Sequence, residues 1–158
     1  MSKVVKPPSD LNAIAGSPSL FLAGSIDMGT AEDWQTSVIS ALADDDLLIF
    51  NPRRDEWDAS WEQSFSNPVF REQVEWEISA LERASMIAMY FSPTSHAPIT
   101  LLELGLFARS EKLVVCCPDG FWRKGNVDVV CNRFNITQVD SLPALIMQIR
   151  KRCCGLEK

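Results

Sequence analysis

The sequence predicts an α/β fold, because short runs of apolar residues alternate with longer amphipathic stretches along most of the chain. The expected strands are almost continuously apolar, which is typical of a parallel sheet that helices cover on both faces. Five successive strand and helix units favour a flavodoxin-like three-layer sandwich with a five-stranded parallel sheet. In such folds the ligand lies beyond the carboxyl ends of the strands.

Each element is expected from its local pattern. Strands are expected where apolar residues follow one another, at 19–23, 47–50, 86–91, 113–117 and, more weakly, 136–139. Helices are expected where apolar residues recur every three or four positions, at 31–43, 69–84, 100–110, 127–134 and 142–153. The chain has 158 residues, of which 46% are hydrophobic, and contains no internal repeat, so residues 19–158 are expected to form a single domain.

Residues 1–18 are polar, contain prolines and lack an apolar stretch, so they are expected to be a flexible leader and not a signal peptide. No later stretch approaches the length that spans a membrane. The expected location is therefore the cytoplasm. A net charge of −6 argues against binding to a nucleic acid polymer, because such proteins usually present a basic surface.

The five cysteines favour reduced thiols over disulfides or a zinc site, because their number is odd and none has CxxC spacing. They are Cys116, Cys117, Cys131, Cys153 and Cys154. His96 is the only histidine, so no metal site is expected.

Glu103 is the only charged residue in the apolar segment 99–108. At helical spacing it shares a face with Ile99, Leu106 and Phe107, so its carboxylate is expected to be buried. A buried carboxylate must be paired, hydrogen-bonded or used in chemistry.

The sequence is compatible with two interpretations of Glu103. Thr100 and Glu103 have the spacing of a capping box, in which Glu103 would bond to the amide of Thr100, and Ile99 and Leu104 have the spacing of a hydrophobic staple. Alternatively, Glu103 is an active-site acid.

A second acid is expected to face the sheet. On helix 69–84 the predicted core stripe consists of Phe70, Val74, Ile78 and Leu81, and Glu77 falls within it. Trp76 lies nearly opposite this stripe, so it is expected to be exposed and to mark an interface between subunits.

The polar segments after the strands are candidates for ligand binding. Gly24 could let backbone amides approach an anionic group, or it could simply form a turn. The long loop 51–68 carries Trp57, Trp61 and Phe65, which could lie over a flat ligand such as a nucleobase or form a small hydrophobic cluster.

Several short motifs together resemble the nucleoside 2-deoxyribosyltransferase family, and within it the deoxyribosyltransferase-like branch that is related to nucleotide N-hydrolases. They are Gly24-Ser-Ile26, Glu77, Leu102-Glu-Leu-Gly105 and Phe121-Trp-Arg-Lys-Gly-Asn126. The resemblance covers roughly residues 19–136.

This resemblance implies that Glu103 is the nucleophile that attacks the anomeric carbon of a (deoxy)ribonucleoside or nucleotide and displaces the base. The glycosyl group would then pass to a free nucleobase in a transferase or to water in a hydrolase. By resemblance Glu77 would protonate the leaving base. No cofactor is implied. Substrate contacts are expected from Gly24, Ser25, Ile26, Asp27, Asn51, Trp57, Ser92, Thr100 and Asn126.

The sequence departs from the family at two positions. A family tyrosine that orients the nucleophile has no counterpart in the first strand, which reads Leu20-Phe21-Leu22, and the polar residue six positions before the nucleophile is Ala97. Ser25, Asp27, Ser92, Ser95 or Thr100 would have to substitute.

Asn126 resembles an asparagine that relatives supply from a neighbouring subunit, which implies a homodimer or larger homo-oligomer, although a solvated turn also explains it. The missing tyrosine favours a second hypothesis, a nucleotide- or nucleobase-binding protein of the same fold with weak catalysis. A flavodoxin-like mononucleotide binder is a third. Arg53, Arg54 and Arg123 are candidates for binding a phosphate group or have surface roles.

Overall fold

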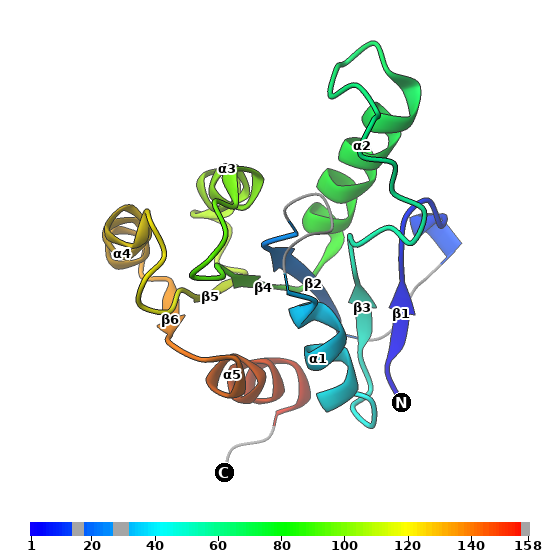
Figure 1. The fold of residues 1–158 in the computed structure, drawn as a ribbon. Coiled ribbons are helices and arrows are strands. Elements are labelled where there is room, and N and C mark those ends of the chain that lie inside the picture. The colour runs from blue at the N-terminus through cyan, green and yellow to red at the C-terminus, as the bar shows by residue number, and fades with distance from the viewer. Residues whose placement is uncertain (14–17, 27–31, 156–158) are drawn as a thin grey trace.

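The computed structural model describes residues 1–13, 18–26 and 32–155, and within these ranges a six-stranded parallel sheet lies between two layers of helices (Figure 1). The strand order is β1-β3-β2-β4-β5-β6. The strands are β1 (Lys3–Val5), β2 (Ser19–Gly24), β3 (Leu48–Phe50), β4 (Met86–Tyr90), β5 (Leu113–Cys116) and β6 (Thr137–Val139). The helices are α1 (Trp34–Ala41), α2 (Pro68–Arg83), α3 (Pro98–Phe107), α4 (Lys124–Arg133), α5 (Leu142–Cys154) and the short 3₁₀ helix η1 (Leu11–Ala13).

The predicted three-layer α/β sandwich is confirmed, but the expected number of five strands is wrong. Residues Lys3–Val5 were assigned to a flexible leader, yet they form β1 and pair in parallel with β3, with Val5 opposite Phe50. This pairing satisfies backbone groups along the outer side of β3. Local polarity concealed the strand because only Val5 of its three residues is buried.

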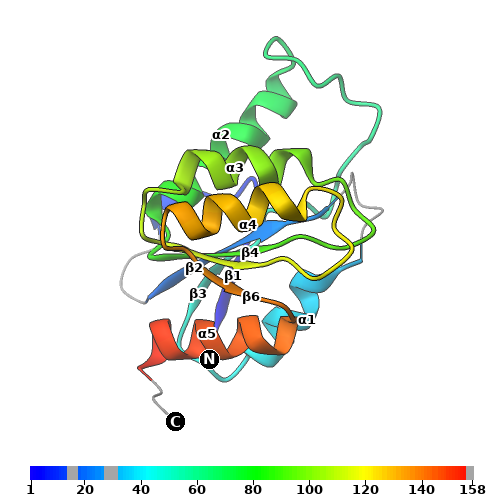
Figure 2. The same cartoon turned by 90° about the vertical axis from the view of Figure 1, so that its left-hand side faces the viewer.

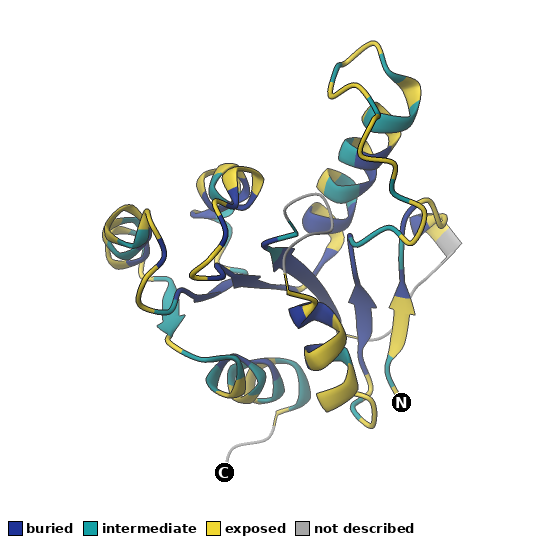
Figure 3. Cartoon of the chain, viewed as in Figure 1, coloured by how far each residue is buried: buried dark blue, intermediate teal, exposed yellow. Residues whose placement is uncertain are grey.

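Alternate residues of the central strands supply two separate hydrophobic cores. Phe21 and Ala23 of β2 point to the face that α2, α3 and α4 cover, whereas Leu20 and Leu22 point to the face of α1 and α5 (Figure 2). The central strands β2, β4 and β5 are buried on both faces, whereas exposed residues lie on the helices, in the loops and on the edge strand β1 (Figure 3). This explains the nearly continuous apolar runs in the sequence.

Local signals determine where α2 begins. The side-chain oxygen of Asn67 accepts hydrogen bonds from the amides of Val69 and Phe70, and Pro68 occupies the first helical position, where its missing N–H is not needed. The helix therefore starts where the long loop after β3 ends.

The rotation of α2 about its own axis differs from the prediction. Trp76 was expected to be exposed, but only 7% of it is accessible, its ring packs edge-on against Phe50, and its Nε1 donates to the Ser9 carbonyl at 2.9 Å. Conversely, Ile78 was assigned to the core stripe and is exposed. The large indole ring and its hydrogen bond to the N-terminal segment outweigh the burial of the isoleucine.

No helix in the described part of the chain is long and apolar enough to cross a membrane.

Candidate active site

The strand order places a topological switch point between β2 and β4, where flavodoxin-like folds bind their ligands. Hydrogen bonds join the chain segments that leave these two strands. The Ser25 amide donates to the Tyr90 carbonyl at 3.1 Å, and the Ser92 amide donates to Ser25 Oγ at 3.0 Å. Both serines are buried. They thus hold the switch point together, and the Ser25 hydroxyl is already engaged by the protein.

Glu103 lies on α3, the helix that follows β4 and whose N-terminus is at the carboxyl edge of the sheet. Only 8% of Glu103 is accessible, and no group in the described ranges hydrogen bonds to its carboxyl oxygens. Burial, together with the nearby negative charge of Glu77, raises the pKa of Glu103 to about 8. The expected burial of this carboxyl group is confirmed, but the face predicted for it is wrong, because Ile99 and Leu106, which were expected to share it, are exposed.

The capping-box interpretation of Glu103 is wrong. The helix begins at Pro98, so Thr100 is its third residue and not its cap, and it is buried. The capping position is Ala97, which has a left-handed backbone conformation with φ of 45° and makes no side-chain capping bond. Glu103 therefore has no role in starting the helix, and its role as an active-site acid stays a prediction.

Glu77 lies on α2, the helix that precedes β4, and the residue as a whole is partly buried. Burial of its carboxyl group raises its pKa to about 7, while a hydrogen bond of 2.7 Å from Gln73 Nε2 to Oε1 opposes this rise. The charge of Glu77 contributes to the raised pKa of Glu103, so the two carboxyl groups titrate as a coupled pair. Among the described residues, neither carboxylate forms an ion pair with a lysine or arginine.

Gly24 has a packing role that neither of its two sequence interpretations anticipated. A Cβ atom at this position would come within 2.5 Å of the Trp34 ring and of the Tyr90 carbonyl oxygen. Trp34 itself is fully buried, and its Nε1 donates to the Ser25 carbonyl at 3.2 Å. Sequence reasoning missed Trp34, although a large aromatic residue at the start of the helix after Gly24 was the available signal.

The loop after β3 is held in place by its own side chains. Trp57 packs edge-on against Trp61 with ring centroids 5.2 Å apart, as expected for a small hydrophobic cluster. Phe65 does not join them and is exposed. The Trp57 Nε1 atom is nevertheless buried and has no hydrogen-bond partner within the described ranges. A ligand in contact with Trp57 could accept this bond.

Two predicted site residues of this loop have protein partners. Asn51 is buried at the end of β3, and its Oδ1 accepts from the Arg53 amide at 3.1 Å. The arginines considered for a phosphate are paired with carboxylates, Arg53 with Asp33 and Arg54 with Glu72. These ion pairs weaken the phosphate interpretation for both arginines.

The remaining predicted site residues are spread over the molecule. Ile26 is partly buried after β2, Asp27 lies outside the described residues, and Asn126 is exposed on α4. Among the proposed substitutes, the Ser92 hydroxyl lies 3.3 Å from that of Thr94, whereas Ser95 Oγ is buried and has no partner in the part of the chain that the structure describes. Ser95 therefore has a free hydroxyl in the loop that leads to α3.

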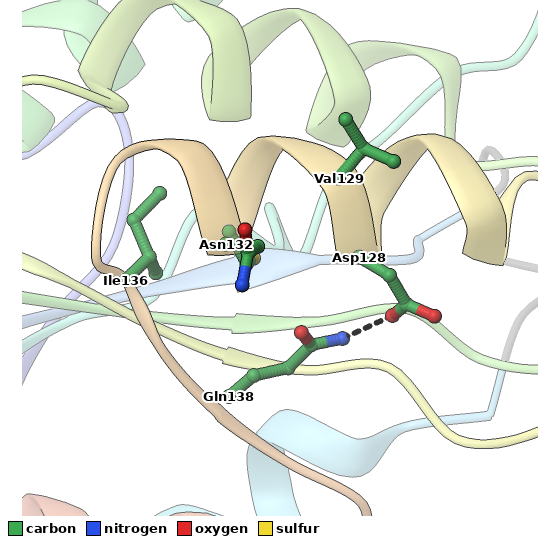
Figure 4. A pocket seen from close by; sticks show the side chains of 6 residues that line it. Asp128, Val129, Asn132, Ile136 and Gln138 are labelled. Carbon is green, nitrogen blue, oxygen red and sulfur yellow. Dashed lines mark hydrogen bonds between the residues drawn. The ribbon is translucent and has the colours of Figure 1, made fainter.

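A hollow of about 500 Å³ lies elsewhere, between α4 and the edge strand β6 (Figure 4). It is lined by Asp128, Val129, Cys131, Asn132, Ile136 and Gln138. Gln138 Nε2 donates to Asp128 Oδ1 at 2.5 Å, so its two most polar side chains satisfy each other. It contains none of the predicted site residues. The described residues also contain no cluster of His, Cys, Asp and Glu suited to a metal ion.

These observations define a class: a flavodoxin-like α/β protein with two coupled glutamates, one from the helix after β3 and one from the helix after β4. The chain belongs to the nucleoside 2-deoxyribosyltransferase-like family, whose model matches residues 17–121 and so includes Glu77 and Glu103. The predicted resemblance is thereby confirmed, while Asn126 lies outside the matched residues.

A solved structure described as a conserved protein from Enterococcus faecalis V583 has a similar fold, with a TM-score of 0.62. Its sequence is 12% identical, and the similarity covers 87% of this chain and 99% of that one. At this identity the likeness concerns the fold alone. Among curated proteins, no sequence matches this chain.

Proposed function

We propose that the protein cleaves or transfers the N-glycosidic bond of a (deoxy)ribonucleoside or nucleotide, with Glu103 as nucleophile and Glu77 as the acid that protonates the departing base. The observation that carries this proposal is the coupled pair itself. Two buried carboxyl groups with raised pKa values lie near each other in a chain of a deoxyribosyltransferase-like family. Such pairs are typical of sites where an acid and a base act together.

The proposed reaction uses one proton and two carboxyl groups. The ionised Glu103 attacks the anomeric carbon, the bond from that carbon to the base nitrogen breaks, and the base leaves with the electron pair and a proton from Glu77. Water or a second base then attacks the glycosyl ester. The attacking water or base gives a proton back to Glu77, and Glu103 is released as a carboxylate. A hydrolase and a transferase differ only in this second step.

One observation favours the alternative of a nucleoside- or nucleotide-binding protein with weak catalysis. No hydroxyl group in the described ranges bonds to Glu103, and Leu20-Phe21-Leu22 occupies the strand where the family's tyrosine lies. A nucleophile that nothing orients reacts slowly, because catalysis depends on held geometry. Binding without turnover would follow.

The protein should be incubated with a panel of purine and pyrimidine nucleosides and their 5′-phosphates, with and without a free acceptor base. Chromatography then separates released base from exchanged base. Release without acceptor identifies a hydrolase, exchange identifies a transferase, and binding in calorimetry without either product supports the alternative. Glu103→Gln serves as the control for contaminating activity.

A homo-oligomer is part of the proposal, on a different surface from the one first expected. Trp76 is buried within the chain, but α3 exposes an apolar stripe of Ile99, Leu102 and Leu106, each more than half accessible. Exposed apolar surface of this kind is typical of interfaces. Association through α3 would bring a second chain close to the helix that carries Glu103.

Because all five cysteines are free thiols, we also propose that the protein works in the cytoplasm.

A further inference from the structure

Gln73 connects Glu77 to the loop that follows β3. It lies one helical turn before Glu77 on α2 and is only 4% accessible. Its Nε2 atom donates to Glu77 Oε1 at 2.7 Å and to the Pro52 carbonyl at 3.1 Å. Both hydrogens of the amide nitrogen are therefore used, one on a carboxyl group and one on the main chain.

The orientation of this amide is forced by its partners. A carbonyl oxygen such as that of Pro52 can only accept a hydrogen bond, so the nitrogen of Gln73 must face it. As a consequence Gln73 Oε1 is buried and has no donor among the described residues. Buried acceptors without partners are rare in folded proteins. The chain tolerates this one in order to keep both donor hydrogens on Pro52 and Glu77.

We propose that Gln73 is a positioning residue for Glu77, which fixes one oxygen of the carboxyl group and leaves Oε2 to exchange the proton with the substrate. Pro52 acts as the fixed point, because its carbonyl holds the amide whether or not Glu77 is charged. This assignment rests on the proposed function, in which Glu77 is the acid at the base. Sequence reasoning missed it because Gln73 and Pro52 are joined only in the folded chain.

The neighbouring charges leave Gln73 as the main group that favours ionised Glu77. Among the described residues, Glu103 on α3 is coupled to Glu77, and the loop after β3, which Gln73 contacts at Pro52, carries Arg53 and Arg54. Glu103 disfavours a second negative charge, and both arginines are engaged by other carboxylates. Loss of the Gln73 amide must therefore raise the pKa of Glu77 further.

The test replaces the amide with a side chain of similar length and no donor, Gln73→Met. Selective ¹³C labelling of glutamate carboxyl carbons and NMR titration then give the pKa of Glu77 in the unmodified and the substituted protein, with Glu77→Ala used for assignment. We expect a rise of about one pKa unit, because hydrogen bonds to charged groups have about that strength. An unchanged pKa in the folded variant overturns the proposal.

Gln35→Met is the matched control. Gln35 is also a buried glutamine beside this loop, where its Oε1 accepts from Arg53 Nε at 3.3 Å, but it has no bond to Glu77. It should leave the pKa of Glu77 unchanged, and an equal rise in this variant would show a general loosening of the loop. If Gln73→Met does not fold, Gln73→Asn withdraws the amide from Glu77 by one methylene and gives the same test.

Enzyme assays provide a second test of the role of Gln73. In Gln73→Met the optimum pH of base release should move upwards, and kcat should fall about 10-fold or more while KM changes less. If the unmodified protein releases no base from any substrate, the proposed function fails. The NMR titration still decides whether Gln73 controls Glu77, so the two failures are distinguishable.

Discussion

The carboxylate of Glu77 on α2 raises the pKa of Glu103 on α3, although the two residues come from different helices on the same face of the sheet. Burial acts in the same direction on both groups. Near neutral pH the pair therefore retains a proton that two exposed glutamates would have lost. This proton is the one that the proposed reaction requires.

The pH dependence of turnover should follow from this pair. We expect a bell-shaped profile of kcat/KM with two apparent pKa values near 7 and 8, because activity needs one carboxyl group ionised and the other protonated. Initial rates of base release between pH 5 and pH 10 measure it. A rate that stays constant from pH 6 to pH 9 would contradict the shared-proton mechanism.

Glu103→Gln should abolish base release and leave the fold intact, because the amide keeps the volume and Glu103 has no capping role. The variant should also lose part of the pH dependence of stability. The ordinary pKa of a glutamate is 4.5, and burial raises the pKa of Glu103 in the folded protein to about 8. The contribution of protonated Glu103 to the free energy of unfolding is therefore complete below pH 4.5 and is lost as the pH rises through 8.

Urea unfolding at pH 5 and pH 9 measures this difference. The free energy of unfolding should fall by a few kcal/mol more in the unmodified protein than in Glu103→Gln. An equal fall in both proteins would show that Glu103 is not the buried acid that the structure describes. Retained turnover in the variant would instead remove Glu103 as nucleophile.

Glu77→Ala should reduce turnover most for substrates whose base leaves poorly without a proton. A natural nucleoside should lose far more rate than a sugar that carries nitrophenolate, since nitrophenolate leaves without protonation. Glu75→Ala, an exposed position on the same helix, is the control. Equal losses on the two substrates would indicate a structural role for Glu77.

Gly24→Ala should destabilise the protein by about 1–3 kcal/mol, because the added methyl group would overlap the Trp34 ring and the Tyr90 carbonyl. Gly105→Ala is a matched comparison in α3, where nothing lies within 4 Å of an added Cβ. It should stabilise the helix by roughly 0.5–1 kcal/mol. Urea unfolding of both variants checks the opposite signs, and a neutral Gly24→Ala would show that Trp34 packs less closely.

Leu102→Glu should dissociate the proposed oligomer, because it places a charge in the middle of the exposed α3 stripe. Light scattering at micromolar concentration measures the change in mass.

Mixing inactive Glu103→Gln and Asn126→Ala chains tests whether a site is shared, since a mixed assembly would contain one complete site. A monomeric unmodified protein, or no recovered activity after mixing, would exclude a shared site.

The sequence by itself determined the class of fold and the burial of one acid, Glu103. Continuous apolar strands between amphipathic helices allow few arrangements other than a parallel sheet covered on both faces, and all five predicted strands are present. The burial of Glu103 could be predicted because it is the single carboxylate in an apolar helix, and this pattern is visible without knowing what the helix packs against. Glu103 also lies within the residues that the family model matches.

Only the tertiary structure decided which side of α2 is buried, whether Glu103 caps its helix, and what holds Glu77. Periodicity shows that a helix has an apolar face, but Trp76 and Ile78 compete for the core, and contacts with Phe50 and Ser9 decide between them. Likewise the bonds of Gln73 to Pro52 and of β1 to β3 join segments that are distant in sequence. Local patterns contain no information about such partners, because the free energy of these contacts arises only when the chain has folded.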